Sequence, residues 1–280
     1  MSSIAAGTLF LVSTPIGNLG DMSHRAIEIL SSVALIIAED TRHSRRLLDH
    51  YGITTPVSSY HEHNEAKETP RLVARLRKGD SIALISDAGT PLISDPGSRL
   101  VEAAIEANIA IVPIPGASSV MAALAASGAP LDRFTFFGFI PRKGRERAET
   151  IVEIVQSKAT VVLFEAANRV VSTLGALSKA GAGERAAVVA RELTKQFEEF
   201  RRGTVAGLAS AYEDAAPRGE VVLVIGGAAP AALLSEPDLV RAAKAAREEG
   251  LSARDVMEHL VSDLGAARNA AYRIAHGVEE

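Results

Sequence analysis

The chain has 280 residues, and its 34 acidic residues outnumber its 30 lysines and arginines, which leaves a formal net charge of -4. This length corresponds to about two domains, and a hydrophobic content of 47% is enough to form cores, which excludes a disordered chain. The absence of cysteine excludes disulfide scaffolds and thiolate chemistry. An aromatic content of 4% argues against a protein that binds nucleic acid by base stacking, and the acidic total argues against generic binding of polyanions.

The first half of the chain alternates short apolar runs with amphipathic helical patterns. Near-continuous apolar runs are typical of strands that are buried on both faces of a mostly parallel sheet. Such runs lie at residues 8–13, 33–38, 81–86 and 109–114. Helices are predicted between them, at residues 23–31, 42–51, 65–78 and 97–107. This βαβα order predicts an N-terminal α/β domain over residues 1–115.

The second half has fewer and less regular helical patterns between its apolar runs. Strands are predicted at residues 134–139, 160–164, 187–191, 199–203 and 220–225. Their uneven spacing indicates a second α/β domain with a mixed sheet over residues 116–230, joined to the first near residues 113–116. The predicted fold class is therefore α/β, with two domains.

The C-terminal part differs from both halves. Residues 226–237 (GGAAPAALLSEP) have the composition of a linker. Helices are predicted beyond them at residues 238–249, 252–264 and 266–276, each preceded by a capping or helix-breaking residue. Residues 236–280 are therefore expected to form a small helical tail.

The sequence carries no membrane or export signal. No apolar run reaches the roughly 18 residues of a membrane span. The first residues lack the basic stretch and the cleavage site of a signal peptide. We therefore expect a cytoplasmic protein that does not enter a membrane.

The loop after the first predicted strand, residues 13–21 (STPIGNLGD), contains two glycines. Glycine lets a backbone approach a ligand closely, and α/β sheets bind ligands at the carboxyl ends of their strands. The spacing is not G-x-G-x-x-G, and the chain has no GK[ST], so neither a dinucleotide fingerprint nor a P-loop is present. A plain turn into a capped helix explains this loop equally well.

Two further loops place charged side chains after strands. Glu39 and Asp40 follow the second apolar run, and basic residues occupy the next helix's first turns at residues 42–46, where cations oppose the helix dipole. Side chains that oppose a local structural preference are typical of a functional site, although an exposed basic helix face is the plainer interpretation. His61 begins the segment HEHNE, whose spacing is not that of a zinc site. We expect a proton acceptor at the mouth of a site there, and no metal.

The most informative segment is residues 87–97 (DAGTPLISDPG). It holds two glycines, two prolines and two aspartates directly after an apolar run. A plain connection needs about two to six residues, so we interpret this loop as shaped around a ligand, toward which backbone groups and a carboxylate are directed. Within residues 113–119 (PIPGASS) a strand ends and a helix begins with small residues. Their small side chains permit a ligand to approach the helix N-terminus.

A second basic segment follows the aromatic strand at residues 134–139. Four basic side chains lie there, opposed only by Glu146: Arg142, Lys143, Arg145 and Arg147. Such a segment suits contacts with a phosphate backbone, and a solvated loop is the plainer alternative. The chain shows no G-x-S-x-G and no Ser-His-Asp order that defines a triad. The chemistry is therefore expected to depend on positioning and not on an activated protein nucleophile.

Together these segments resemble the tetrapyrrole methylase superfamily and, within it, the family of ribosomal RNA small subunit methyltransferases I. The resemblance covers about residues 7–230, and AEDTR (38–42) and SDAGTPLISDPG (86–97) are its most specific segments. It extends over further segments: STPIGNLGD (13–21), SYHEHNE (59–65), PIPGASS (113–119), DRFTFFGFIPRKGRER (132–147), ARELTKQFEE (190–199) and GEVVLVIGG (219–227). The helical tail is similar to the short helix-turn-helix-like extension of these enzymes.

The resemblance implies a fold, a cofactor and a reaction. The fold would be two α/β domains with S-adenosylmethionine in the cleft between them. The reaction would be methyl transfer to the ribose 2′-hydroxyl of a cytidine in the decoding region of 16S ribosomal RNA, within the small ribosomal subunit. The resemblance also implies a homodimer, for which the aromatic strand at residues 134–139 is the expected contact.

The resemblance also assigns residues to the cofactor by their positions. These residues are Pro15, Gly17, Asp87, Thr90, Leu92, Ser118, Ser119, Phe164, Leu193 and Glu220. One departure stands at residues 164–169 (FEAANR), where relatives often have F-Y/F-E-S-x-H-R. A serine and a histidine are therefore missing, while Glu165 and Arg169 remain.

Methyl transfer from a sulfonium needs an aligned acceptor oxygen, exclusion of water and a group that accepts the hydroxyl proton. The candidate proton acceptors are Asp21, Glu39, Asp40 and His61. RNA phosphates are expected to contact Arg42, Arg45, Arg46, Arg142, Lys143, Arg145 and Arg147.

Two other functions remain open on the same fold. A methylase of a small tetrapyrrole would need an apolar cleft and no phosphate contacts, which the basic segments disfavour. A non-catalytic RNA-binding assembly factor is disfavoured by the intact loop at residues 87–97.

Overall fold

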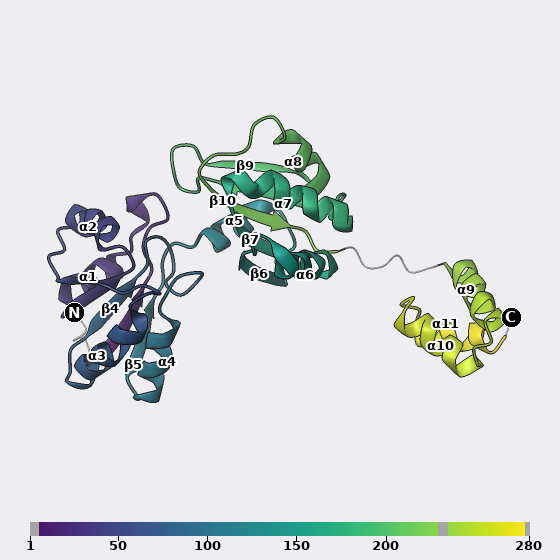
Figure 1. Ribbon diagram of the computed structural model, residues 1–280, viewed down its shortest axis with the longest axis horizontal. Helices are drawn as coiled ribbons and strands as arrows, with labels where there is room; N and C mark the ends of the chain where they lie inside the picture. The colour runs from purple at the N-terminus through teal and green to yellow at the C-terminus, as the bar shows by residue number, and fades with distance from the viewer. Residues whose placement is uncertain (1–5, 229–234, 278–280) are drawn as a thin grey trace. The chain divides into compact units, whose positions relative to one another are not determined.

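The computed structural model describes residues 6–228 and 235–277, and these form two compact units, one up to Gly227 and one from Ala228 onward. The first unit contains two five-stranded sheets, whereas the described part of the second is helical (Figure 1). The predicted linker at residues 226–237 falls mostly on residues 229–234, which lie outside the described residues, as do residues 278–280 of the predicted tail. No described helix is long and apolar enough to cross a membrane.

The first sheet is parallel throughout, with strand order β3-β2-β4-β1-β5. Its strands are β1 (Thr8–Val12), β2 (Leu35–Ala38), β3 (Val57–Ser59), β4 (Ile82–Ile85) and β5 (Ala110–Ile114). Its helices are α1 (His24–Ser32), α2 (Thr41–His50), α3 (Glu65–Arg77) and α4 (Ser98–Glu106). The sequence did not predict β3, because its three residues are short of apolar side chains and largely exposed.

Helices cover both faces of the first sheet, which explains why β2 and β4 are apolar at every position. On one face, Leu30 of α1 and Leu48 of α2 pack against the sheet. On the other face, Leu72 of α3 and Leu100 of α4 do so. The carboxyl ends of the strands therefore remain open, and the loops that follow them lie at one edge of the sheet.

The second sheet is mixed, as predicted, with strand order β6-β7-β10-β8-β9. Its strands are β6 (Phe134–Phe139), β7 (Thr160–Ala166), β8 (Ala186–Arg191), β9 (Glu199–Thr204) and β10 (Glu220–Ile225). The pair β6–β7 is parallel, and the pairs β7–β10, β10–β8 and β8–β9 are antiparallel.

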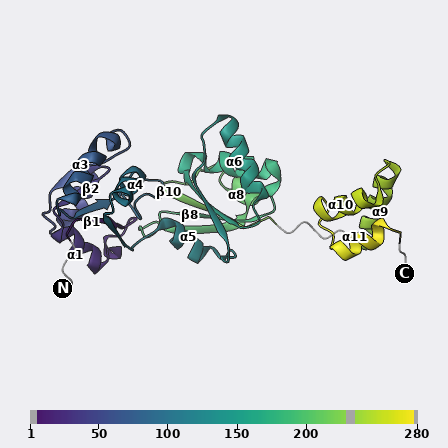
Figure 2. The ribbon, with the colours of Figure 1, turned by 90° about the horizontal axis from the view of Figure 1, so that it is seen from below.

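The two faces of the second sheet are covered by different helices, as Figure 2 shows for α5 on one side and α6 and α8 on the other. The helices are α5 (Ser119–Ser127), α6 (Gly144–Gln156), α7 (Val170–Leu177) and α8 (Val205–Ala211). Along β10, Val221 and Leu223 pack with α6, α7 and α8, whereas Val222 and Val224 pack with α5. This alternation is that of a strand whose side chains point to opposite faces of the sheet. Because α5 packs on the second sheet, we propose that the two domains meet between β5 and α5.

The helical tail has a core of its own. Its helices are α9 (Glu236–Glu248), α10 (Ala253–Ser262) and α11 (Arg268–Ala275). Leu239, Val256 and Leu260 are buried among the alanines of these helices. At the start of α10, Ser252 and Asp255 form a capping box, which satisfies amides of the first turn. Two sheets that are each covered by helices, together with a helical tail, confirm the expected α/β fold class.

Candidate functional site

A cavity of about 440 Å³ lies in the first unit, between the loops that follow the strands of the first sheet and the second sheet. This volume is within the roughly 300–1,000 Å³ of small-molecule sites. The first sheet contributes residues that follow β1, β2 and β4, and the second contributes the ends of β6 and β7, the start of β10 and the first turn of α5. The cavity therefore has the position that α/β sheets use for ligands.

Hydrogen bonds between loops fix the floor of the cavity. Thr14, after β1, and Gly89, after β4, exchange two backbone hydrogen bonds of 2.9 and 3.1 Å. The Ser13 hydroxyl donates to the Thr90 hydroxyl at 3.2 Å, and the Thr90 hydroxyl donates to the Ala117 carbonyl at 3.4 Å. Three loops that are distant in sequence are thus joined at one point.

Several residues around the cavity have a left-handed backbone. Non-glycine residues with positive φ are Leu92 (72°) and Ser94 (66°) in the loop after β4, and Glu192 (50°) and Thr194 (66°) on either side of Leu193. Such conformations are costly for residues with a side chain, and they gather at ligand sites where the surroundings hold them. Both loops contribute residues to the cavity wall.

The wall formed by the first sheet is acidic. Glu39 follows β2, and Asp87 and Asp95 belong to the loop after β4. Burial and the nearby Glu39 carboxylate raise the pKa of Asp95 to about 6. Burial, with Asp87 next in effect, also raises the pKa of Glu39. Glu39, Asp87 and Asp95 thus place three carboxylates on one wall, which a positively charged group would stabilise.

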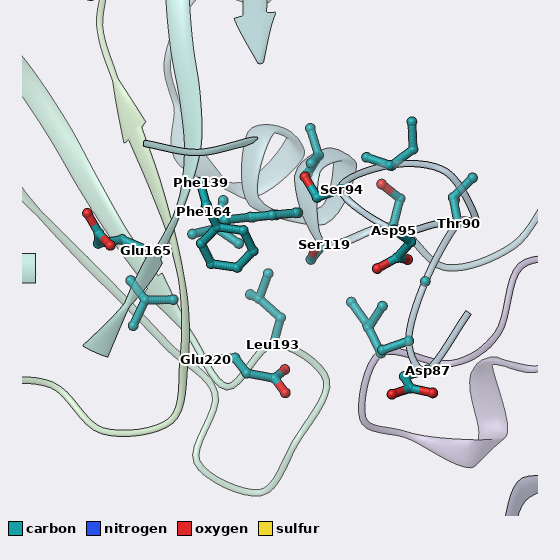
Figure 3. Close-up of a pocket in the computed structure, with 18 of the residues that line it drawn as sticks. Asp87, Thr90, Ser94, Asp95, Ser119, Phe139, Phe164, Glu165, Leu193 and Glu220 are labelled. Carbon is teal, nitrogen blue, oxygen red and sulfur yellow. The ribbon is translucent and has the colours of Figure 1, made fainter. Parts of the chain in front are cut away.

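The opposite wall is apolar and comes from the second sheet. Figure 3 shows Phe139, Phe164 and Leu193 on the other side of the cavity from Asp87 and Asp95. The rings of Phe139 and Phe164 lie 5.4 Å apart between centroids. The pairing register of β6 with β7 shifts between Phe136 and Phe139, and Phe139 is paired with Phe164. This wall suits a flat apolar group.

One edge of the apolar wall is fixed by ion pairs. The Lys195 ammonium lies 3.0 Å from a carboxylate oxygen of Glu220 and 3.1 Å from one of Glu192. Glu192 also accepts a hydrogen bond of 3.1 Å from the Glu220 amide. The left-handed Gly219 makes this possible, because a Cβ there would lie 2.2 Å from the Glu192 carboxylate.

The four predicted proton acceptors lie in different places. Glu39 lines the cavity. Asp40 is the N-cap of α2, where its carboxylate accepts from the amides of Arg42 (2.8 Å) and His43 (3.3 Å), and these bonds lower its pKa. Asp21 is exposed in a short 3-10 helix, Leu19–Asp21. His61 follows β3, outside the cavity wall, and its buried Nδ1 has no hydrogen-bond partner among the described residues.

Most of the predicted cofactor residues line the cavity. Those that do are Asp87, Thr90, Ser118, Ser119, Phe164, Leu193 and Glu220. Pro15, Gly17 and Leu92 lie outside its wall. Gly17 instead borders the second sheet's loop, since a Cβ there would lie 2.5 Å from a Lys195 side-chain carbon.

Sequence reasoning did not assign to the cofactor several residues of the wall. These are Ile16, Ala88, Gly89, Ile93, Ser94, Asp95, Val120, Phe139, Glu165, Ala166, Gly219, Val221 and Val222, together with Glu39, which was interpreted only as a proton acceptor. Asp95 carried a signal, as the second aspartate of the loop at residues 87–97. Many of the others lie in the same loops or strands as assigned residues, whereas Phe139 lies on β6, which was interpreted only as a dimer contact.

The two basic segments differ in how free their side chains are. Arg42, Arg45 and Arg46 are exposed on α2, and Arg42 pairs with the cap residue Asp40 at 3.5 Å. Arg142, Lys143 and Arg145 are also exposed, with Arg145 paired to Glu149 at 2.6 Å. Arg147 is different, because its half-buried guanidinium donates to the Pro141 carbonyl and to the Thr173 hydroxyl.

The site therefore combines three properties. One wall of the cavity is acidic, the other is aromatic and apolar, and the second basic segment begins three residues after Phe139 of the wall. The cavity suits a molecule with a positive charge and a flat apolar group. The adjacent exposed cations suit a polyanion.

Comparisons with known proteins agree with this geometry. The family model described as Tetrapyrrole (Corrin/Porphyrin) Methylases matches residues 8–209. A protein of Synechocystis sp. named ribosomal RNA small subunit methyltransferase I is 45% identical over 275 residues, which cover 98% of this chain and 99% of that protein.

Solved structures are similar in fold. A cobalamin biosynthetic enzyme, cobalt precorrin-4 methyltransferase, matches with a TM-score of 0.61 at 19% identity, over 80% of this chain and 98% of that chain. A uroporphyrin-III C-methyltransferase from Thermus thermophilus, complexed with S-adenosylhomocysteine, matches with a TM-score of 0.56 at 15% identity, over 78% of this chain and 96% of that chain.

Proposed function

Because the chain belongs to the tetrapyrrole methylase family and is an S-adenosylmethionine-dependent ribosomal RNA methyltransferase, we propose that it methylates the ribose 2′-hydroxyl of a cytidine in the decoding region of 16S ribosomal RNA. The observation that carries this proposal is the contrast between the cavity and its rim. An acidic and aromatic cavity suits the cofactor, and an exposed basic segment at its edge suits RNA phosphates. The relative that covers 98% of this chain is named for ribosomal RNA and not for a tetrapyrrole, which supports RNA as the substrate.

The residues of the cavity fit S-adenosylmethionine, which when bound supplies a methyl group already activated by a sulfonium. Asp87, Asp95 and Glu39 would face the positive charges of the cofactor, which would relieve their mutual repulsion. Phe164 and Leu193 would pack against the flat adenine. The first turn of α5, at Ser118 and Ser119, would offer amides to the carboxylate of the methionine portion.

Within this proposal Glu39 accepts the proton of the ribose hydroxyl. Of the four candidates it alone lines the cavity, and its raised pKa brings the carboxylate closer to the pKa that a base needs near neutral pH. Asp40 is occupied as a helix cap and keeps α2 in place. The remaining task of the protein is to align the hydroxyl and to exclude water.

The RNA would be held by the exposed cations at the rim. The cations Arg142, Lys143 and Arg145 begin three residues after the cavity residue Phe139, and those of α2 begin three residues after the cavity residue Glu39. These side chains would contact phosphates and thereby orient one nucleotide toward the cavity. We propose that the natural substrate is the RNA within the small ribosomal subunit, in the cytoplasm.

We further propose that the protein acts as a homodimer. The strand β6 is at an edge of the second sheet, and its Phe134 and Phe139 are 42% and 60% exposed. An exposed aromatic edge strand is a surface that a second chain would cover. Analytical ultracentrifugation of the parent and of Phe134→Lys would test this, with a monomeric parent as the contradicting result.

A pair of adjacent variants tests the assignment of Glu39. Glu39→Gln should lower kcat about a hundredfold, the lower end of general-base effects, while the cofactor dissociation constant changes much less. Asp40→Asn is the matched control, because asparagine caps helices as well as aspartate does, and its kcat should stay close to that of the parent. Equal effects of the two substitutions would contradict the assignment.

A further inference from the structure

Glu165 lines the cavity, yet the function proposed above makes no use of its carboxylate. The residue is 2% exposed, on β7, and its carboxylate points away from the cavity (Figure 3). Burying a charge is costly unless it is paired and hydrogen-bonded. The partners of this carboxylate therefore indicate what it holds in place.

The carboxylate has a complete set of partners. One oxygen accepts from the Ala166 amide at 3.0 Å and lies 3.2 Å from Nε of Arg169. The other oxygen accepts from the buried Thr173 hydroxyl at 2.6 Å. Thr173 in turn accepts from a guanidinium nitrogen of Arg147 at 3.1 Å. We call these four residues, Glu165, Arg169, Thr173 and Arg147, the Glu165 network.

The outer ends of the Glu165 network meet on two backbone carbonyls. Arg169 donates to the carbonyls of Ile140 (3.0 Å) and Pro141 (3.2 Å). Arg147 donates to the same Pro141 carbonyl at 3.2 Å. Two guanidinium groups thus hold the residue that directly precedes Arg142, the first exposed cation of the basic segment.

We propose that the Glu165 network positions the basic segment relative to the cavity, so that Glu165 and Thr173 are positioning residues for RNA. The inference rests on the proposed function, in which Arg142, Lys143 and Arg145 contact RNA phosphates. The segment leaves the cavity wall at Phe139, and the network fixes the next two carbonyls from the same strand that carries Phe164. The cofactor site and the RNA contacts are therefore joined by one rigid connection.

The arrangement of charges favours positioning over simple stabilisation. A buried ion pair is often no more stable than apolar residues of the same volume, and this one adjoins an apolar core that includes Ile140 and Val170. Guanidinium groups bind carbonyls in a fixed geometry, whereas apolar residues would not fix the orientation of the backbone carbonyls. The Glu165 network therefore supplies a defined path for the backbone at residues 140–141.

The test uses Thr173, which touches neither cofactor nor RNA in this account. Thr173→Val keeps the shape of the side chain and removes the hydroxyl that joins Glu165 to Arg147. Amide hydrogen exchange at residues 147–150, the first hydrogen-bonded amides of α6, should become about tenfold faster, and the Michaelis constant for RNA should rise about tenfold, which is about 1.4 kcal/mol. The cofactor dissociation constant should stay within about twofold of the parent. Thr173→Ser restores the hydroxyl and should restore both values.

A matched control separates positioning from general stability. The guanidinium of Arg185 also donates to backbone carbonyls, but it lies outside the cavity wall. Its acceptors are the carbonyls of Gly226 (2.5 Å), Ile154 (3.0 Å) and Val155 (3.2 Å). Arg185→Gln should lower the melting temperature without the selective effect on RNA. If Thr173→Val fails to fold, Arg169→Lys replaces it and should give the same pattern, because lysine keeps the charge but lacks the guanidinium that binds the carbonyls of Ile140 and Pro141.

The outcomes distinguish this inference from the proposed function. Unchanged exchange at residues 147–150 in Thr173→Val overturns the inference, whatever the substrate is. An equal loss of RNA and cofactor binding also overturns it, because that is the result of a purely structural role. If exchange accelerates but the parent itself does not methylate RNA, the network positions the segment as inferred and the proposed function is the part that fails.

Discussion

Replacing Asp95 with asparagine should make the protein more stable at neutral pH and weaken its binding of S-adenosylmethionine. Asp95 is half-buried beside Glu39, and its pKa is raised from the ordinary 3.8 to about 6. Asparagine resembles the protonated, neutral form of the side chain. The substitution therefore removes the cost of keeping a third carboxylate ionised in the acidic wall.

The size of this effect follows from linkage. At 1.36 kcal/mol for each pKa unit, the raised pKa corresponds to about 3 kcal/mol when the group is fully ionised. Solvent screens a half-buried side chain, so we expect about 1–1.5 kcal/mol. At pH 4, close to the ordinary pKa of 3.8, only a small part of this difference has developed, so parent and variant should differ much less than at neutral pH. As the pH rises through 6, the parent loses this stability and the variant does not.

Urea unfolding of parent and variant at pH 4 and pH 7.5 measures the difference directly. The exposed Asp214, which has no described partner, provides the control Asp214→Asn, and its stability should equal that of the parent. Calorimetry at pH 7.5 should then show that Asp95→Asn binds the cofactor about threefold to tenfold more weakly, since one charge facing the cation is lost. A variant that is no more stable than the parent at pH 7.5, or equally stabilised at pH 4, would refute this reasoning.

Further outcomes follow from the same geometry. Asp87→Ala should weaken cofactor binding strongly in calorimetry, and unchanged affinity would exclude Asp87 from the cofactor site. Replacing Arg142, Lys143 and Arg145 together with alanine should weaken RNA binding in a filter assay and flatten its salt dependence, and a loss of cofactor binding instead would mean that the segment is structural. Cofactor affinity of the parent should rise between about pH 5 and 7 as the acidic wall ionises, and a flat titration would argue against that wall. A chain that ends after β10 should keep its cofactor affinity, because the described tail has a hydrophobic core of its own; a large loss would contradict the separate core of the tail.

Periodicity in the sequence was sufficient to predict most of the fold. Strands that are buried on both faces, such as β2 and β4, are apolar at every position, and this pattern can be read without a structure. The strand β3 was missed because Val57–Ser59 gains its strand conformation from pairing with β2 and not from its own composition. Pairing with a neighbouring strand can therefore form a strand where the local sequence pattern does not indicate one.

The candidate site was predictable where a loop departs from a plain connection. The loop at residues 87–97 has more glycine, proline and aspartate than a turn needs, and it contributes much of the cavity wall. The separation of Glu39 from Asp40 was not predictable, because adjacent carboxylates look alike in a sequence. Only the structure shows that one lines the cavity and the other caps α2.

The Glu165 network shows a second limit of sequence reasoning. Glu165 and Arg169 were recognised as the retained part of a departing segment, but their partners at Ile140, Pro141 and Thr173 come from other elements. Arg147 was assigned to RNA with its neighbours, although its guanidinium is bound within the fold. Charge alone does not distinguish a cation that holds the backbone from one that is free to bind a ligand.

The central claim is tested most directly by the methylation of ribosomal RNA in cells with and without this gene. Nucleoside mass spectrometry of the decoding region of 16S RNA distinguishes methylation of the ribose from methylation of the base. We predict that a 2′-O-methylated cytidine is lost with the gene and restored by the parent chain but not by Glu39→Gln. Loss of a base methylation, or an unchanged pattern of ribose methylation, would contradict it.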